Sequence, residues 1–296
     1  MSDPVVELRG VTRRYPKSGQ GVHDLDLHLA PGESYGLVGR NGAGKTTALR
    51  LVMGMLRPTS GTVRVFGLDP FAEPERAKVR VGYLAEDQEF PLALTPADLF
   101  RLHQDLYPSW RADFADSLSR KLTLAVGRRL RELSKGQRRQ AGLVCALAHR
   151  PALLVLDEPA GGLDPVVRRE FLEEVVDLLS DEGTTVLFSS HILQEVERVA
   201  GRIGVLDDGR LILDRDVAAL REGSCRVLVD GVDAARAAAL QDCVRADAKD
   251  GAVTMTFLCA EAEARRRVAE GLGAAPRQSS RLSLEDLFVD LVGGAR

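Results

Sequence analysis

The chain carries, at residues 39–46, the stretch Gly-Arg-Asn-Gly-Ala-Gly-Lys-Thr, which fits the pattern GxxxxGK[ST]. The preceding residues 34–38, Ser-Tyr-Gly-Leu-Val, are a short apolar run that predicts a buried strand. Residues 47–56 then repeat apolar side chains at helical spacing. A strand, a glycine-rich loop and a helix in this order predict an α/β protein whose loop binds a nucleoside triphosphate.

The residues of this loop suit phosphate chemistry. Its glycines let backbone N–H groups approach phosphate oxygens without Cβ clashes, beside the positive end of the following helix. Lys45 is expected to reach the β- and γ-phosphates and to take part in catalysis, and the Thr46 hydroxyl is expected to ligate Mg²⁺. The predicted nucleotide-binding residues of the segment are Gly39, Asn41, Gly42, Ala43, Gly44, Lys45, Thr46 and Thr47.

A second apolar segment supplies two carboxylates. Residues 152–156, Ala-Leu-Leu-Val-Leu, are typical of a central parallel strand, and Asp157 and Glu158 follow it. Asp157 is predicted to hold Mg²⁺, directly or from the second shell. Glu158 is predicted to act as the general base or to position the attacking water. The chain has no NKxD-type segment that would read guanine, which argues against a GTPase.

The composition narrows the class of protein. The chain has 296 residues, a net charge of −3 and 45% hydrophobic residues, and roughly 100–200 residues per domain allows two domains. No apolar run reaches the roughly 18 residues of a membrane-spanning helix, and the first residues do not resemble a secretory signal, so a cytosolic location is expected. The four cysteines form no CxxC pair, and we expect buried free thiols.

The residues before the second strand resolve the class. Residues 133–137, Leu-Ser-Lys-Gly-Gln, resemble the LSGGQ signature of ATP-binding-cassette (ABC) proteins, and residues 1–222 are identified as an ABC nucleotide-binding domain. Four further segments carry this resemblance: Tyr15 is similar to the A-loop residue that stacks on adenine, residues 82–86 to the Q-loop, residues 160–164 to the D-loop, and His191 to the switch histidine.

The resemblance implies a fold and a mechanism. The fold is an α/β P-loop NTPase with a RecA-like core, an antiparallel β subdomain and a helical subdomain over about residues 88–150. In the family, two cassettes pair head to tail, and each ATP lies between the phosphate loop of one cassette and the signature of the other. Ser134, Gly136 and Gln137 are therefore expected to bind the ATP of a second cassette, most simply in a homodimer. Hydrolysis then releases the pair.

The resemblance also assigns roles to single side chains. His191 is expected to hydrogen-bond the leaving oxygen and the water, and so to be catalytic without being the base. Asp164 either reaches the partner cassette or begins the helix that follows it. Glu86 replaces the usual Gln of the Q-loop; it is expected to bind Mg²⁺, like Thr46 and Asp157, and to couple activity more tightly to Mg²⁺.

The sequence leaves the roles of two basic features open. Lys135 replaces the central Gly of the signature, and it either helps to hold the γ-phosphate or points to solvent. The dense basic stretch of residues 128–139 is interpreted as a solvated helix face or as a dimer-interface complement to the charge of ATP. No aromatic residues are interleaved there, so no nucleic-acid partner is expected.

Residues 223–296 form the predicted second domain, a small α/β accessory domain. Residues 221–224 are polar and predict a linker. The strands and helices expected over residues 225–281 follow a βαββαβ order, which predicts a ferredoxin-like fold. Leu284, Leu287, Phe288 and Leu291 then lie on one face of a closing helix with Ser283 as its cap. The domain is expected to serve dimerisation or regulation, or to be a stabilising appendage.

The end of the chain and the segments YPSW, LSKGQRRQ and LFSSHILQEVERVAGRIGVL are similar to export-type bacterial ABC ATPases of the antibiotic- and peptide-resistance branch. This resemblance implies that ATP hydrolysis powers export of a small molecule, drug or peptide through a separate membrane permease. The protein would then lie peripherally on the cytoplasmic face of the inner membrane. The alternative is a soluble ABC ATPase that acts on a nucleic-acid or ribosomal complex.

Overall fold

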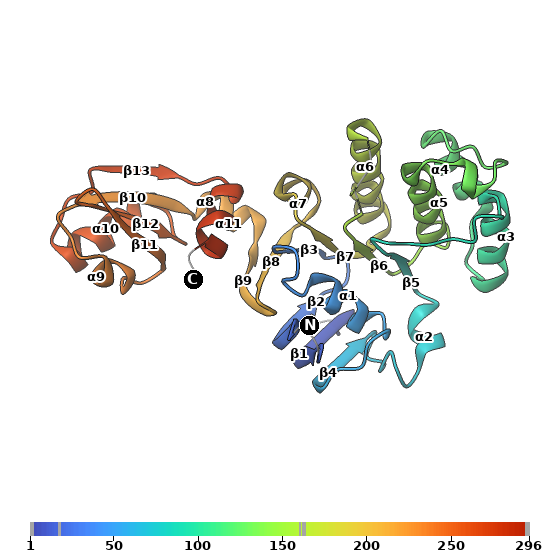
Figure 1. Ribbon diagram of the computed structural model, residues 1–296, viewed down its shortest axis with the longest axis horizontal. Helices are drawn as coiled ribbons and strands as arrows, with labels where there is room; N and C mark the ends of the chain where they lie inside the picture. The colour runs from blue at the N-terminus through green and yellow to red at the C-terminus, as the bar shows by residue number, and fades with distance from the viewer. Residues whose placement is uncertain (1–2, 17–18, 160, 162–163, 294–296) are drawn as a thin grey trace. The chain divides into compact units, whose positions relative to one another are not determined.

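The computed structural model describes residues 3–16, 19–159, 161 and 164–293. The chain divides into two compact units, residues 1–213 and 214–296 (Figure 1). The sequence predicts domains of residues 1–222 and 223–296, so the first compact unit is shorter than the predicted first domain. The linker expected at residues 221–224 does not end as an exposed polar segment, because Ser224 is buried. The Ser224 hydroxyl donates to the Leu220 carbonyl, and the Ser224 carbonyl accepts the N–H of Leu282.

The central sheet of the first unit contains, in order across the sheet, β5 (Val81–Leu84), β6 (Leu153–Asp157), β7 (Thr185–Ser190), β3 (Ser34–Val38), β8 (Arg202–Asp207) and β9 (Arg210–Asp216). The paired strands from β5 to β8 are parallel. β7 separates β3, which leads into the glycine loop, from β6, which ends at Asp157. Because parallel strands end at the same edge, the loop and the carboxylates emerge side by side.

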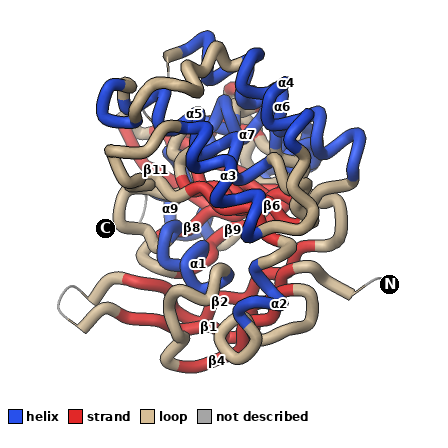
Figure 2. The backbone as a smooth tube through the Cα atoms, turned by 90° about the vertical axis from the view of Figure 1, so that its right-hand side faces the viewer, coloured by secondary structure: helices blue, strands red, loops and turns tan. Residues whose placement is uncertain are grey.

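A smaller antiparallel sheet lies beside the central sheet. Its strands, in order, are β2 (Gly21–Leu29), β1 (Val6–Arg14) and β4 (Ser60–Val65). Helix α1 (Lys45–Val52) packs between the two sheets, and its Leu49 and Leu51 belong to the core shared by both (Figure 2). The helix is shorter than predicted, since Gly54 takes a left-handed φ of 62° just beyond its end.

Helices cover the rest of the first unit. The predicted helical subdomain consists of α3 (Pro96–Leu106), α4 (Ala112–Lys121), the 3₁₀ turn η1 (Leu130–Glu132) and α5 (Lys135–Leu147). The remaining helices are α2 (Pro74–Lys78), α6 (Pro165–Glu182) and α7 (Leu193–Val199). Figures 1 and 2 show α3, α4 and α5 together on one side of the sheet. The predicted core, antiparallel β subdomain and helical subdomain are thus confirmed.

The second unit has its own sheet and core. Its strands, in order, are β11 (Cys243–Lys249), β12 (Ala252–Phe257), β10 (Cys225–Asp230) and β13 (Gln278–Arg281), and all pairs are antiparallel. Its helices are α8 (Val217–Glu222), α9 (Ala234–Ala238), α10 (Glu261–Leu272) and α11 (Leu284–Gly293). From β10 to β13 the chain follows the predicted βαββαβ order. The helix predicted over residues 233–243 is shorter, because β11 already begins at Cys243.

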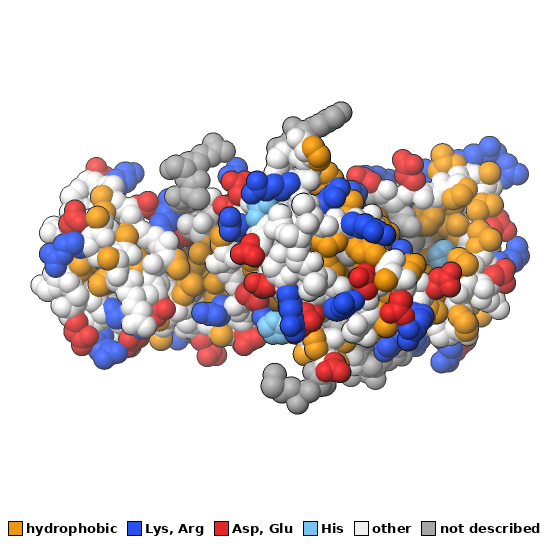
Figure 3. Space-filling view, turned by 90° about the horizontal axis from the view of Figure 1, so that it is seen from below, with side chains coloured by type: hydrophobic (Ala, Val, Ile, Leu, Met, Phe, Trp, Pro, Cys, Tyr) orange, Lys and Arg blue, Asp and Glu red, His pale blue; other side chains and the backbone are white. Residues whose placement is uncertain are grey.

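Side-chain burial agrees in part with the sequence analysis. Cys145 and Cys225 are buried free thiols as expected, whereas Cys243 and Cys259 are free but only half-buried. Ser283 caps α11 by accepting the N–H of Asp286 at 3.0 Å. On the face of the molecule seen in Figure 3, Lys and Arg side chains alternate with Asp and Glu. No helix in the described residues combines the length and the apolarity needed to cross a membrane.

Candidate nucleotide-binding site

The glycine loop lies between β3 and α1, and two of its glycines are required by close packing. A Cβ atom on Gly39 would lie 2.4 Å from the carbonyl oxygen of Leu206. Gly44, the residue before α1, has a φ of 107°, and a Cβ there would lie 2.4 Å from the carbonyl oxygen of Gly21. Neither position accepts a side chain without backbone movement, which explains the spacing of these glycines in the motif.

A pocket of about 300 Å³ opens over this loop. Of the predicted site residues, it gathers Tyr15, Asn41, Gly42, Ala43, Gly44, Lys45, Thr46, Thr47, Glu86, Glu158 and His191. Its other lining residues, Gln20, Gly21 and Arg40, lie in segments next to these and were not singled out from the sequence. Residues from five separate stretches of the chain therefore meet around the phosphate loop.

Lys45 is directed to the carboxylate that follows β6. Its side chain is only 6% exposed, and Nζ lies 3.2 Å from Oε1 of Glu158. The same ammonium group donates to the carbonyl oxygen of Gly39 at 2.8 Å. A buried ammonium group requires such partners, because an unpaired charge in the interior is costly.

Thr46, which lines the pocket, is hydrogen-bonded to Asp157 at the end of β6. The Thr46 hydroxyl donates to Oδ1 of Asp157 at 3.1 Å, and the Ser189 hydroxyl donates to the same oxygen at 2.7 Å. Ser189 also accepts the backbone N–H of Glu158 at 2.8 Å. Ser189 lies on β7 in register with Asp157, and sequence analysis missed its role because a buried serine on an apolar strand has no motif.

Glu158 also contacts His191. Oε2 of Glu158 lies 2.6 Å from Nδ1 of His191 and 3.3 Å from the backbone N–H of the same residue. The histidine side chain is 54% exposed, whereas that of Glu158 is 9% exposed. The carboxylate thus lies between Lys45 on one side and a solvent-accessible imidazole on the other.

Glu86 lies beyond the end of β5, at the rim of the pocket. Burial raises the pKa of its carboxyl group above the ordinary value, and the charges of Asp157, Asp87 and Glu158 act in the same direction. The nearby Arg139 guanidinium opposes this rise. Glu86 is thus within electrostatic reach of Asp157.

Arg139 corrects the interpretation of the basic stretch. Arg128, Arg129, Arg131 and Lys135 are exposed and Arg138 is half-buried, but Arg139 is only 7% exposed. Its guanidinium donates to the carbonyl oxygens of Glu86, Asp157, Glu158 and Pro159. It is therefore packed against the backbone that carries the site rather than on a solvated face. A dense run of charges in the sequence gives no sign that this one arginine turns inward.

Five predicted residues do not line this pocket: Gly39 and Asp157, which contact its lining residues Lys45 and Thr46, and the three signature residues. Ser134, Gly136 and Gln137 lie at the beginning of α5, where Ser134 and Gln137 form a capping box. Lys135, between them, is exposed. Asp164 accepts the N–H of Val166 at 2.9 Å and so begins α6, which is one of the two roles expected for it. Ala160 and residues 162–163 of the expected D-loop lie outside the described residues.

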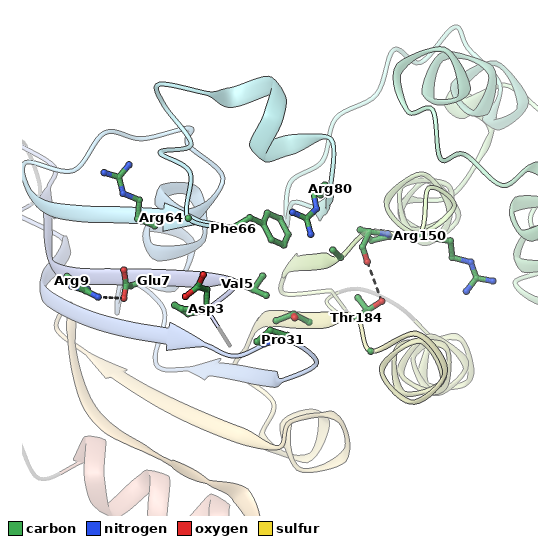
Figure 4. A pocket seen from close by; sticks show the side chains of 16 residues that line it. Asp3, Val5, Glu7, Arg9, Pro31, Arg64, Phe66, Arg80, Arg150 and Thr184 are labelled. Carbon is green, nitrogen blue, oxygen red and sulfur yellow. Dashed lines mark hydrogen bonds and ion pairs between the residues drawn. The ribbon is translucent and has the colours of Figure 1, made fainter. Parts of the chain in front are cut away.

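A larger pocket of about 750 Å³ lies elsewhere in the first unit (Figure 4). It is lined by Asp3, Val5 and Pro31 and by Arg80, whose guanidinium lies 3.9 Å from the centre of the Phe66 ring. Figure 4 shows Arg9 paired with Glu7 and Arg64 turned away from its centre. Its charged groups do not converge, so the smaller pocket at the glycine loop is the candidate site.

Comparison with known proteins agrees with this geometry. Residues 22–161 match the family described as ABC transporter. The chain is 31% identical to the bacitracin transport ATP-binding protein BcrA of Enterococcus faecalis, over 98% of this chain and 97% of that protein. It is 37% identical to the daunorubicin resistance ATP-binding protein DrrA3 of Streptomyces coeruleorubidus, over 72% and 69% of the two chains.

Among solved structures, an ATP-binding subunit of an ABC transporter is similar with a TM-score of 0.66 and 26% identity, over 73% of this chain and 92% of that one. The sequence likeness, the shared fold and the pocket at the glycine loop agree with one another. The chain therefore belongs to the ABC transporter family, as an ATP-binding subunit that hydrolyses ATP.

Proposed function

We propose that this chain powers the export of a small molecule, drug or peptide through a separate membrane permease. The observation that carries the proposal is the convergence of Lys45, Glu158 and His191 over the phosphate loop, in a chain similar from end to end to a bacitracin transport subunit. The similarity to a daunorubicin resistance protein supports the export direction. The two subunits are named for structurally different compounds, so a drug-like or peptide cargo is the class proposed.

The donor set at the phosphate loop fits Mg²⁺. The Thr46 hydroxyl and the Asp157 carboxylate lie 3.1 Å apart, with the Glu86 carboxylate on the same pocket. No group of three or more His, Cys, Asp or Glu side chains suited to a metal occurs in the described part of the chain. The Thr46 hydroxyl and the two carboxylates suit Mg²⁺, which is commonly held by one or two carboxylates together with substrate phosphates. The bound ion would neutralise charge on the phosphates of ATP.

Lys45 binds the β- and γ-phosphates in this proposal, and Tyr15 stacks on adenine. Glu158 orients the attacking water and accepts its proton, since it is a carboxylate held beside the phosphate loop. His191 hydrogen-bonds the γ-phosphate and keeps Glu158 in place through the 2.6 Å contact. The proton thus passes to Glu158, and His191 assists without acting as the base.

The second half of each site comes from another cassette. Ser134, Gly136 and Gln137 lie outside the pocket of their own chain, which supports a role toward the ATP of a second copy. Backbone N–H groups at the first turn of α5 favour an anion there. A head-to-tail homodimer is the simplest arrangement that gives each ATP both a phosphate loop and a signature turn.

Binding to the permease would hold the chain at the membrane. The cassette would dock through its helical subdomain and Q-loop, and so lie peripherally on the cytoplasmic face of the inner membrane. No nucleic acid takes part in this proposal, because a net charge of −3 gives no overall positive excess to hold a nucleic-acid backbone. Affinity purification of the tagged protein from solubilised membranes tests the partner: a co-purified polytopic membrane protein is expected, whereas ribosomes or nucleic acid would contradict the proposal.

A comparison of two variants tests the catalytic part. Glu158→Gln should bind ATP and form a stable dimer while losing about 10²–10⁴ of its turnover. Lys45→Ala should fail earlier, at ATP binding. Both are measured by light scattering with and without saturating ATP and by release of inorganic phosphate. A Glu158→Gln protein that stays monomeric with ATP, or that hydrolyses ATP at the wild-type rate, would contradict the proposal.

A further inference from the structure

We infer that Arg139 is a positioning residue for ATP hydrolysis, because it holds the backbone that carries Asp157 and Glu158. The inference rests on the proposed role of Glu158. It concerns a residue that touches no reacting atom and lines neither the predicted phosphate site nor the signature turn. Its effect would therefore be exerted through other residues.

The contacts of Arg139 are unusual in their number and in their targets. Nε donates to the carbonyl oxygen of Pro159 at 2.7 Å and Nη1 donates to that of Glu86 at 2.7 Å. Nη2 donates to the carbonyl oxygens of Asp157, at 3.0 Å, and of Glu158. One planar guanidinium thus links the last residue of β6 and the two residues after it to the segment after β5. Lysine has no planar fork of donors and cannot reproduce this pattern.

These carbonyl groups lie where the sheet ends. The paired register of β5 and β6 stops at Leu84 and Leu156, so the oxygens beyond it have no β5 neighbour. Buried carbonyl groups need hydrogen-bond donors. The Gly161 N–H already donates to the Glu158 carbonyl at 3.0 Å, and the guanidinium adds a donor to each of the four carbonyl groups. Arg139 therefore supplies hydrogen bonds at the point where β5 and β6 separate and the backbone pairing between them ends.

The backbone at Glu158 needs such support. Its φ is +46°, in the left-handed region that residues with a Cβ rarely adopt. The Ser189 hydroxyl holds the N–H of Glu158, and Arg139 holds its carbonyl oxygen. Strained conformations at functional sites persist only when the surroundings over-determine them. With contacts on both sides of the residue, the side chain is directed to Lys45 and His191.

Arg139 stays charged despite its burial, because a guanidinium group is not deprotonated in proteins. Burial lowers the pKa of the guanidinium, whereas the carboxylates of Glu86, Asp157 and Glu158 raise it. The residue also belongs to α5, the helix that begins at the signature turn, five residues and about 7.5 Å of helix after Ser134. A movement of that turn would thus reach the carbonyl groups after β6 through a single side chain.

The test uses Arg139→Lys in the full-length protein. We expect kcat for ATP hydrolysis to fall about a hundredfold, the cost of a small misplacement of catalytic groups, with KM changed by no more than about threefold. Arg202→Lys is the matched control, because Arg202 is also largely buried and donates to a backbone carbonyl, that of His28, and contacts Glu33. It should lower the melting temperature without lowering kcat.

A double-mutant cycle separates positioning from folding. If Arg139 acts through Glu158, adding Arg139→Lys to Glu158→Gln should lower the residual single-turnover rate by no more than about twofold. Equal losses in both backgrounds, or a rise in KM that accounts for the whole effect, would overturn the inference. Glu158→Gln alone reports on the proposed function: wild-type turnover there rejects the role of Glu158, whereas an inactive Glu158→Gln with an active Arg139→Lys rejects only this inference.

Folding is checked by thermal melting and by binding of MgADP. If Arg139→Lys does not fold, Arg139→Gln, which keeps one amide donor and removes the buried charge, replaces it in the same cycle. If neither variant yields folded protein, Arg139 is a residue of folding alone and the inference is wrong.

Discussion

Oε2 of Glu158 lies 2.6 Å from Nδ1 of His191. The two residues are separated by a whole helix and strand in the sequence, α6 and β7, and they meet because β6 and β7 are adjacent parallel strands that end at the same edge. The contact places an exposed imidazole against a buried carboxylate, and so links solvent to the interior of the site.

This contact predicts the effect of His191→Ala. Loss of a hydrogen bond to a charged group, worth about 1.5–3 kcal/mol, should lower kcat roughly tenfold to a hundredfold. The affinity for ATP should change little, because Lys45 and the loop N–H groups remain. Phosphate release and binding of a fluorescent ATP analogue are the measurements. Unchanged turnover in His191→Ala would show that Glu158 needs no support from the imidazole.

Ser189→Ala tests the second support of the carboxylates. The fully buried hydroxyl bridges Asp157 and the N–H of Glu158, so its loss should destabilise the first unit by about 1–3 kcal/mol and lower kcat. Thr185→Val, at the opposite end of β7, removes a hydroxyl that accepts the N–H of Gly32. This control should lose comparable stability in urea unfolding but keep its turnover; equal losses of turnover in both variants would contradict a local role for Ser189.

Glu86→Gln tests the departure in the Q-loop. Wild-type Glu86 adds negative charge near the proposed Mg²⁺ ligands, which should lower the Mg²⁺ concentration needed for half-maximal ATPase rate relative to Glu86→Gln. Mg²⁺ titrations at fixed ATP compare the two proteins, and Glu89→Gln, an exposed neighbour, serves as the control. Identical titration curves for wild type and Glu86→Gln would remove the prediction.

The cysteines predict a pattern of thiol reactivity. Burial raises the pKa of the Cys225 thiol to about 12 and raises the pKa of Cys145 further, so little thiolate exists at pH 8 in either. Because raised pKa values are lost on unfolding, both thiols should react rapidly only in denaturant. In native protein, an aromatic disulfide reagent should react first with the half-buried Cys243 and Cys259. Rapid native labelling of Cys145 would contradict the packing of α5.

The sequence by itself determined the parts of this protein that are local. The glycine loop is encoded by spacing within eight residues, because a tight turn, two close backbone approaches and a helix start are all local requirements. The βαββαβ order of the second unit is encoded in the same way, by short alternating segments. Asp157 and Glu158 could be singled out because two adjacent carboxylates follow an apolar run of five residues.

Only the tertiary structure decided how these parts meet. That β7 lies between β3 and β6, that its Ser189 therefore reaches Asp157, and that Arg139 alone turns inward from a run of basic residues all depend on contacts between distant segments. Arg139 binds backbone carbonyl groups, which every residue has. Its partners therefore cannot be predicted from any pattern of side chains in the sequence. The physical reason is that periodicity and motif spacing report local geometry, whereas burial and pairing are decided by the packing of elements far apart in the chain.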